Sequence, residues 1–481
     1  MYWKKASTLL LLYAATAIIS PAQTVTTLAS FDQTNGATPR FGSLVQATNG
    51  DLYGTTQAGG ANNYGTIFKI TPAGLLTTLH SFNLTDGANP TAGLVQATNG
   101  DLYGTTSLGG NGMGCSASGC GTIFKITVDG ALITLYNLNL TDGIGPGGLI
   151  QAANRDFYGT TTERGAGTST NCPGGCGTIF KITPAGALTV LHNFDSTDGG
   201  EPGDLVQATN GELYGTTMIG GSGTACVYGC GTIFKITPAG ALTTIHSFNG
   251  HDGSLTNAGL VQATNGDLYG TTFVGGNLCA YNQTCGTIFK ITPAGVFTTL
   301  HNFSGTDGAS PEDRLVQGTD GDLYGTTFYG GSNYYSGTIF RITPAGVLTT
   351  LHVFEPPTAG GDPAAGLVQD TNGDLYGTTM DGGPGKCSNP NGCGTVFKLS
   401  VGLAPFVRTL PNMGGAGSAV RILGTDLSGA TSVTFNGIAA AFSVVSPTQI
   451  LARVPSGATT GKVQVTTPGG TLLSNVGFVV P

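Results

Sequence analysis

Acidic side chains are the groups of this sequence whose placement could support chemistry. Glu201 and Asp204 lie in one short segment, and Glu312 and Asp313 lie in a second, related one. Two carboxyl groups about 5 to 10 Å apart can hydrolyse a glycosidic bond. These four residues are therefore the candidates for carboxylates at a shared ligand-binding or catalytic site.

Five further aspartates occur in related segments, and a glycine follows each of them. We include them in a candidate ligand-binding face, although Asp-Gly also marks ordinary turns and that alternative stays open. They are Asp86, Asp142, Asp198, Asp252 and Asp307.

Five histidines recur at equivalent places, which argues against one metal site. Repeated residues of this kind are expected to be packed and hydrogen-bonded within separate units. The sequence shows no serine or cysteine nucleophile motif, and we predict no metal site and no cofactor. The histidines are His80, His192, His246, His301 and His352.

Ten cysteines form five close pairs, which we expect to be disulfide bonds in an oxidising compartment. Metal binding by thiolates is the alternative, but each pair would bring two ligands without a second pair or a histidine nearby in sequence. The pairs are Cys115 and Cys120, Cys172 and Cys176, Cys226 and Cys230, Cys279 and Cys285, and Cys387 and Cys393.

The elements that must position these groups belong to an internal repeat. The phrase Leu-Val-Gln, once Leu-Ile-Gln, recurs every 50 to 56 residues, and a period of this length is typical of propellers and solenoids. Its seven copies begin at Leu44, Leu94, Leu149, Leu205, Leu260, Leu315 and Leu367.

Each copy reads as four antiparallel strands, here named A to D in chain order. In the first copy, Asn49-Gly50 joins A (44–48) to B (51–56), and Pro72-Ala73-Gly74 joins C (65–71) to D (75–82). Asn-Gly between alternating runs is a strong hairpin signal. Four strands per repeat predict the blades of a seven-bladed β-propeller.

The two ends of the repeat region predict how the ring closes. The seventh copy has strands A to C but no D, while residues 24–31 resemble a D strand without its copy. The N-terminal strand should therefore complete the last blade and protect its edge. An open stack of sheets is the competing architecture, and it would not need these complementary halves.

The blade model predicts where three sets of repeated residues lie. All five cysteine pairs fall in the loop between B and C, where they would staple the longer loops. A basic residue on C and an acidic residue at the start of B are hypothesised to pair within each blade. The glutamine of strand A, such as Gln46, is expected to bridge neighbouring blades, with a ring of glutamines around the axis as the alternative.

The composition agrees with an all-β chain. Glycine supplies 81 of 481 residues, about 17% against a usual 7% or so, and only 9% of residues are charged. Long helices are therefore not expected. The formal net charge of −8 argues against nucleic acid and anionic membrane surfaces as partners.

Residues 1–22 have the pattern of a secretory signal peptide. Lys4 and Lys5 precede an apolar stretch, and Ser20-Pro21-Ala22 ends the segment with small residues. About 14 apolar residues fall short of the roughly 20 that cross a bilayer, so we predict no transmembrane span in the mature chain. We expect the protein to be secreted, extracellular or at the cell surface, with the periplasm as an alternative.

The sequence of the repeat resembles that of the bacterial GloVer (Gloeo/Verruco) tandem repeat family. The resemblance rests on Gly-Asp-Leu-Tyr-Gly-Thr-Thr, Gly-Thr-Ile-Phe-Lys-Ile-Thr-Pro-Ala-Gly and Leu-His-Ser-Phe, and it spans roughly residues 24–399. It implies an exported protein and brings no established activity.

A different module follows the repeats. The phrases Ile-Leu-Gly, Val-Thr-Phe-Asn-Gly, Gly-Lys-Val-Gln-Val and a final Phe-Val-Val resemble an IPT/TIG domain, which implies an Ig-like β-sandwich. The predicted organisation is residues 1–22 signal peptide, 23–402 propeller and 403–481 IPT/TIG-like domain.

These features favour an exported, non-catalytic binding or surface-interaction protein. The loops from B to C and from D to the next A share one end of the propeller, and irregular loops on a rigid scaffold commonly bind ligands. The expected partner is a glycan, a protein or a cell-envelope component. The alternative is a glycosidase or lyase that acts on a polysaccharide with carboxylates at the axial mouth.

Overall fold

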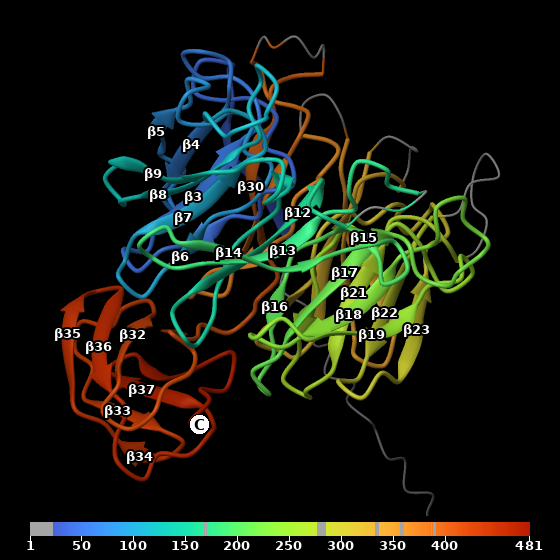
Figure 1. Ribbon diagram of the computed structural model, residues 1–481. Coiled ribbons are helices and arrows are strands. Elements are labelled where there is room, and N and C mark those ends of the chain that lie inside the picture. Colours follow the sequence, from blue (N-terminus) through green and yellow to red (C-terminus); the bar gives the residue numbers. More distant parts are fainter. Residues whose placement is uncertain are drawn as a thin grey trace, which may run out of the picture.

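The computed structural model describes residues 23–167, 169, 171–276, 285–331, 336–355, 360–385, 387 and 391–481. Within these ranges the regular elements are β-strands, and none is a helix long and apolar enough to cross a bilayer. The all-β prediction is confirmed (Figure 1). The predicted signal peptide, residues 1–22, lies outside the described residues.

The repeats form seven sheets within the described part of the chain, each with strands in the order A-B-C-D. The A strands are two residues long: β2 (Val45–Gln46), β6 (Val95–Gln96), β11 (Ile150–Gln151), β16 (Val206–Gln207), β20 (Val261–Gln262), β24 (Val316–Gln317) and β28 (Val368–Gln369). The B strands are β3 (Leu52–Thr56), β7 (Leu102–Thr106), β12 (Phe157–Glu163), β17 (Leu213–Ile219), β21 (Leu268–Thr272), β25 (Leu323–Thr327) and β29 (Leu375–Thr379).

The two outer positions are equally regular. The C strands are β4 (Thr66–Ile70), β8 (Thr122–Ile126), β13 (Thr178–Ile182), β18 (Thr232–Ile236), β22 (Thr287–Ile291), β26 (Thr338–Ile342) and β30 (Thr395–Ser400). The D strands are β5 (Leu76–Ser81), β9 (Leu132–Asn137), β14 (Leu188–Asn193), β19 (Leu242–Ser247), β23 (Phe297–Asn302), β27 (Leu348–Val353) and β1 (Thr24–Ser30). In copies three and four, β10 (Ile144–Pro146) and β15 (Gly200–Pro202) also pair with strand B.

The N-terminal strand closes the structure as predicted. β1 pairs antiparallel with β30, from Thr24 opposite Ser400 to Ser30 opposite Thr395. One buried cluster also joins Phe31 and Phe68 to Tyr376 and Val396, so the first and last copies share a core. The sheets therefore form the blades of a β-propeller.

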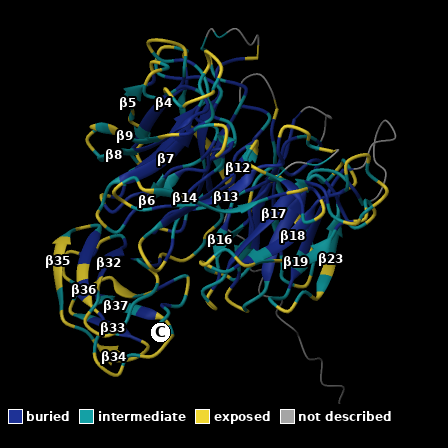
Figure 2. Cartoon of the chain, viewed as in Figure 1, coloured by how far each residue is buried: buried dark blue, intermediate teal, exposed yellow. Residues whose placement is uncertain are grey.

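The hydrophobic cores lie between neighbouring blades. Tyr53 and Phe82 of the first copy pack with Phe124 and Ile126 of the second in one buried cluster. Strand B contributes a glycine to this packing, because a Cβ on Gly54 would lie 2.6 Å from Cζ of Phe68. Strands B and C are accordingly almost fully buried, whereas the residues of strand D are intermediate or exposed (Figure 2).

The glutamines of strand A link one blade to the next, as predicted. In six junctions a glutamine Oε1 accepts a hydrogen bond of 2.8 to 3.0 Å from a backbone N–H at the A–B turn of the preceding blade. One of these bonds joins Thr371 N of the last copy to Gln46 of the first. At the seventh junction, Oε1 of Gln369 has no hydrogen-bond partner among the described residues.

The C-terminal strands form the two sheets of a sandwich. One sheet has the order β31 (Arg408–Leu410), β32 (Ala419–Leu423), β36 (Gln449–Arg453) and β35 (Phe442–Ser446). The other has β34 (Ile438–Ala439), β33 (Ser432–Phe435), β37 (Val463–Thr467) and β38 (Gly470–Leu473). Val420, Val433, Phe435 and Val465 are buried together between them, which confirms the predicted Ig-like fold.

The sandwich lies against the A–B turn end of the propeller (Figure 1). Arg421 Nε donates to Thr98 O over 3.1 Å, and Thr448 Oγ1 donates to Thr48 O over 3.0 Å. Asn475 Nδ2 donates to the carbonyl of Gln317 over 3.0 Å. The loops from D to A and from B to C are at the other end.

Candidate functional site

The four carboxylates that interrupt the repeat line one cavity. It has a volume of about 350 Å³, and Glu201, Asp204, Glu312 and Asp313 are all among its lining residues. Phe41 contributes an aromatic ring to the same wall. We call this cavity the axial mouth, because the segments that line it lead into strand A in several copies.

Asp313 and Asp204 are held in place by backbone N–H groups of other copies. Asp313 Oδ2 accepts a hydrogen bond from Gly366 N over 2.6 Å and one from Ser43 Oγ over 3.2 Å. Asp204 Oδ1 accepts from Gly148 N over 2.7 Å. A Cβ on Gly148 would lie 2.7 Å from Asp204 Oδ2, so glycine there makes room for the carboxylate. Because Ser43 directly precedes the first copy and Asp313 precedes the sixth, this contact reaches across the seventh copy.

Glu312 is the mouth carboxylate best suited to carry a proton near neutral pH. Burial raises its pKa to about 7, against the lowering effect of Arg40 and with further raising by Asp313 and Asp362. Arg40 Nη2 lies 3.5 Å from Glu312 Oε1, while Glu312 Oε2 is buried without a hydrogen-bond partner among the described residues. Burial and Asp381 raise the pKa of Asp362 to about 7 as well.

Glu201 lies at another side of the mouth. Its residue has a positive φ of 52°, in the extra strand β15. Burial raises the pKa of its carboxyl group, and the nearby charge of Glu163 raises it further. Glu163 also lines the mouth, so this wall is acidic without a compensating base among its lining residues.

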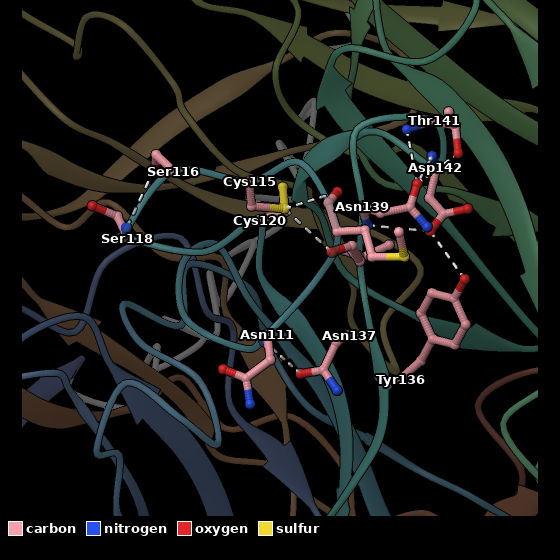
Figure 3. The surroundings of a disulfide bond; sticks show 12 residues. Asn111, Cys115, Ser116, Ser118, Cys120, Tyr136, Asn137, Asn139, Thr141 and Asp142 are labelled. Carbon is pink, nitrogen blue, oxygen red and sulfur yellow. Dashed lines mark hydrogen bonds between the residues drawn. A yellow bond between two sulfur atoms is a disulfide. The ribbon is translucent and has the colours of Figure 1, made fainter.

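The five repeated aspartates are not brought together at the mouth. Four of them accept or share a hydrogen bond of 2.7 to 3.1 Å with the histidine of their own D strand: His80 with Asp86, His192 with Asp198, His246 with Asp252, and His301 with Asp307. Asp142 accepts instead from Tyr136, over 3.0 Å (Figure 3). These contacts organise separate turns after strand D.

The basic and acidic residues of strands C and B pair within each blade, as hypothesised. The distances between nitrogen and oxygen are 3.2 to 4.0 Å, and the side chains are partly exposed, so each pair contributes little to stability. The pairs are Lys69–Asp51, Lys125–Asp101, Lys181–Asp156, Lys235–Glu212, Lys290–Asp267, Arg341–Asp322 and Lys398–Asp374.

Four cysteine pairs are bonded in the loops between B and C: Cys115–Cys120, Cys172–Cys176, Cys226–Cys230 and Cys387–Cys393. Figure 3 shows the first of them, where Cys115 Sγ lies 3.6 Å from the Leu138 carbonyl at the end of strand D. Cys285 is disulfide-bonded too, and its predicted partner Cys279 lies outside the described residues.

Sequence reasoning missed Arg40, Glu163 and Asp362 as neighbours of the candidate carboxylates. Arg40 meets Glu312 because the first and sixth copies approach each other around the closed structure, although 272 residues separate them in sequence. A search for residues that depart from the repeat could have found Arg40, since the residue after the equivalent proline is Thr91, Gly147, Gly203 or Ala364 in copies two, three, four and seven. Within the described residues, no three histidine, cysteine or acidic side chains form a group that could hold a metal ion.

Comparison with protein families agrees with this architecture. The profile of the Gloeobacter/Verrucomicrobia repeat matches residues 15–227, 112–281 and 222–439, and that of the IPT/TIG domain matches residues 407–480. The chain therefore belongs to the Gloeobacter/Verrucomicrobia repeat family and ends in an IPT/TIG domain. No curated protein matches its sequence.

Several solved structures resemble parts of the chain at low identity. A luciferin-regenerating enzyme is 12% identical with a TM-score of 0.44, over 80% of this chain and 97% of its own. The periplasmic gluconolactonase of Pseudomonas aeruginosa is 14% identical with a TM-score of 0.45, over 68% of this chain and 86% of its own. An extracellular domain assigned to a hybrid two-component system of B. thetaiotaomicron is 12% identical with a TM-score of 0.49, over 95% of this chain and 57% of its own. These similarities assign no activity to this chain.

Proposed function

We propose that the protein is an exported binding protein that takes a glycan into the axial mouth. The observation that carries this proposal is the gathering of Glu201, Asp204, Glu312 and Asp313 in one cavity, although the repeat has no acidic residue at most equivalent places. The sandwich contacts the other end of the propeller, which leaves this end to the loops.

Sugar hydroxyls suit the chemistry of the mouth. Ionised carboxylates accept hydrogen bonds, and a sugar ring presents several donors close together. Phe41 offers an apolar face beside them, and Arg40 lies 4.2 Å from the centre of its ring. Specific sites commonly combine a few fixed polar groups with such apolar contacts.

The disulfides support the proposed export, since such bonds persist in oxidising compartments. We extend the proposal to the segment boundaries: residues 1–22 as the signal peptide, 23–402 as the propeller and 403–481 as the IPT/TIG-like domain. Mass spectrometry of the exported protein should find Gln23 as its first residue. An N-terminus at Met1 would contradict the cleavage.

A glycan array with the mature chain tests the binding proposal. We expect saturable binding to a subset of glycans, at least about tenfold weaker in Asp204→Asn because the amide removes a negative acceptor. Asp129→Asn is the matched control, since Asp129 is exposed in a C–D turn away from the mouth. Equal binding by wild type and Asp204→Asn would contradict a role for the mouth.

One observation favours a second function, that of a glycosidase or lyase. A carboxyl group with a pKa of about 7, as in Glu312, can exchange protons at neutral pH, while a neighbouring carboxylate could serve as base or nucleophile. Incubation of bound glycans with the protein, followed by chromatography, distinguishes the two functions. Products that disappear with Glu312→Gln would establish the enzyme, and binding without products would support the non-catalytic function.

A further inference from the structure

A second cavity lies between the A strands of the propeller and the start of the sandwich. Its volume is about 460 Å³, and its propeller wall carries the valines of several Val-Gln strands, including Val95, Val206, Val261 and Val316. Leu410 and Val476 approach it from the sandwich. We call this cavity the interdomain chamber.

The chamber is cationic, although the chain as a whole has a formal net charge of −8. Arg155, Arg314 and Arg408 are among its lining residues, and no aspartate or glutamate is among the described residues that line it. An apolar wall with only positive charges suits a ligand that carries a negative head and an apolar body.

Arg408 is a lining arginine whose positive charge has no ionic partner among the described residues. Its Nη2 donates to the carbonyl of Gln46, and the described residues place no carboxylate within ion-pair distance of its guanidinium. Burial lowers the pKa of Arg408 to about 10. A partly buried cation without an ionic partner is destabilising, and a bound anion would offset this cost.

Arg314 adds a second charge at a place where the repeat has small residues. Glycine occupies the equivalent place in four copies, at Gly93, Gly148, Gly259 and Gly366. Arg314 is exposed and lines the chamber. The acidic residue beside it is Asp313, whose pKa is raised by burial and lowered by the charge of Arg314. Arg314 is thus available to a ligand.

One lining residue of the chamber has a buried acceptor without a donor. Gln369 lines it, and Gln369 Oε1 is the one glutamine oxygen of the blade junctions that is buried without a hydrogen-bond partner among the described residues.

We propose that the interdomain chamber is a second binding site, which takes a small organic carboxylate with an apolar body. The carboxylate pairs with the arginines, which bind planar anions through two parallel N–H groups. The apolar body packs against the valines of the A strands. This site differs from the acidic mouth in charge, and its Arg314 directly follows Asp313 of the mouth.

Isothermal titration of the full mature chain with three probes tests the proposal. Octanoate has both the charge and the apolar body, 1-octanol has the body alone, and inorganic phosphate has charge alone. We expect octanoate to bind at least about tenfold more tightly than either of the others. Equal binding of octanol would overturn the role of the arginines, equal binding of phosphate would overturn the role of the valines, and absence of octanoate binding would overturn the site.

Variants then assign the binding to the chamber. Arg314→Gln and Arg155→Gln change exposed side chains, so folding should be retained, and each should weaken octanoate binding about tenfold. Arg453→Gln is the matched control, because Arg453 is an exposed arginine of the sandwich that does not line the chamber. Unchanged affinity in both chamber variants would overturn the proposal.

Discussion

The carboxyl group of Glu312 couples the stability of the protein to pH. Its side chain is only 9% exposed, and its pKa lies at about 7 in the folded chain against an ordinary value of 4.5. Between these two values the folded chain holds a proton that the unfolded chain has released. The free energy of unfolding that Glu312 contributes is therefore complete below about pH 4.5 and falls as pH rises towards 7.

Glu312→Gln should remove this dependence, because the amide cannot ionise. The pKa shift corresponds to about 3 kcal/mol. We expect the free energy of unfolding of the variant, relative to wild type, to improve by about this amount between about pH 4.5 and about pH 8. Urea unfolding across this range measures it.

The matched control for this measurement is Asp129→Asn, at an exposed position in a turn. Its stability relative to wild type should change little over the same range. A constant difference between Glu312→Gln and wild type would show that Glu312 ionises normally in the folded protein.

The inner strands show how one glutamine per element can align neighbouring blades. Gln96 is buried, its Oε1 accepts from Thr48 N over 2.9 Å, and its Nε2 donates to Gly100 O over 3.0 Å. Gln96→Leu leaves a buried backbone N–H without an acceptor, which costs about 1 to 3 kcal/mol. We expect a loss of stability of that size in chemical unfolding.

The seventh junction provides a matched comparison for this prediction. Gln369 is equally buried, but its Oε1 accepts no hydrogen bond among the described residues, and its Nε2 contacts are 3.4 and 3.5 Å long. Gln369→Leu should therefore cost clearly less than Gln96→Leu. Equal losses would indicate that the bridging hydrogen bond contributes nothing beyond packing.

The disulfide loops are elements whose staples act locally. Cys115 and Cys120 are five positions apart, and closing so short a ring restricts the unfolded chain by only about 2 kcal/mol. Replacing both by serine should lower global stability by no more than about that amount but expose the loop to protease. Limited proteolysis with mass spectrometry should find new cleavage between residues 111 and 120, and an unchanged pattern would contradict a stapling role.

Much of this element-level organisation was predictable because it repeats. The roles of Gln46, of the Lys69–Asp51 pair and of the closing strand follow from counting equivalent positions in a blade. The carboxylates Glu201 and Glu312 were recognisable as departures from the repeat. The contact between Arg40 and Glu312 was not predictable, because it is set by the closure of the whole ring.

At the scale of the whole molecule, the two ends of the propeller have different neighbours. The sandwich contacts the A–B turns through single residues, such as Arg421 to Thr98 and Asn475 to Gln317. Contacts of this kind do not recur with the repeat, so the sequence predicted the sandwich but not its position on the propeller. Residues of both domains line the interdomain chamber, so neither domain would form it alone.

Closure by β1 should be the contact on which the whole propeller depends most. β1 covers the edge of β30, and Leu28 and Phe31 belong to the core shared by the first and last copies. Without residues 23–31, that edge and core face water, which favours aggregation and separates the last blade from the first. We expect the deletion variant to unfold at least about 10 °C below the wild type. Each kcal/mol of lost stability lowers the melting temperature by a few degrees, and this deletion should cost several kcal/mol.

Removing the sandwich, residues 403–481, is the contrasting truncation. It takes away the chamber but leaves the pairing of β1 with β30 intact, so the propeller should still unfold cooperatively.

A synthetic peptide of residues 23–32 should restore the melting temperature of the β1 deletion, because it can pair with the open edge of β30, whereas a scrambled peptide should not. If the deletion melted like the full chain, or if both peptides acted alike, β1 would not be the strand that closes the ring.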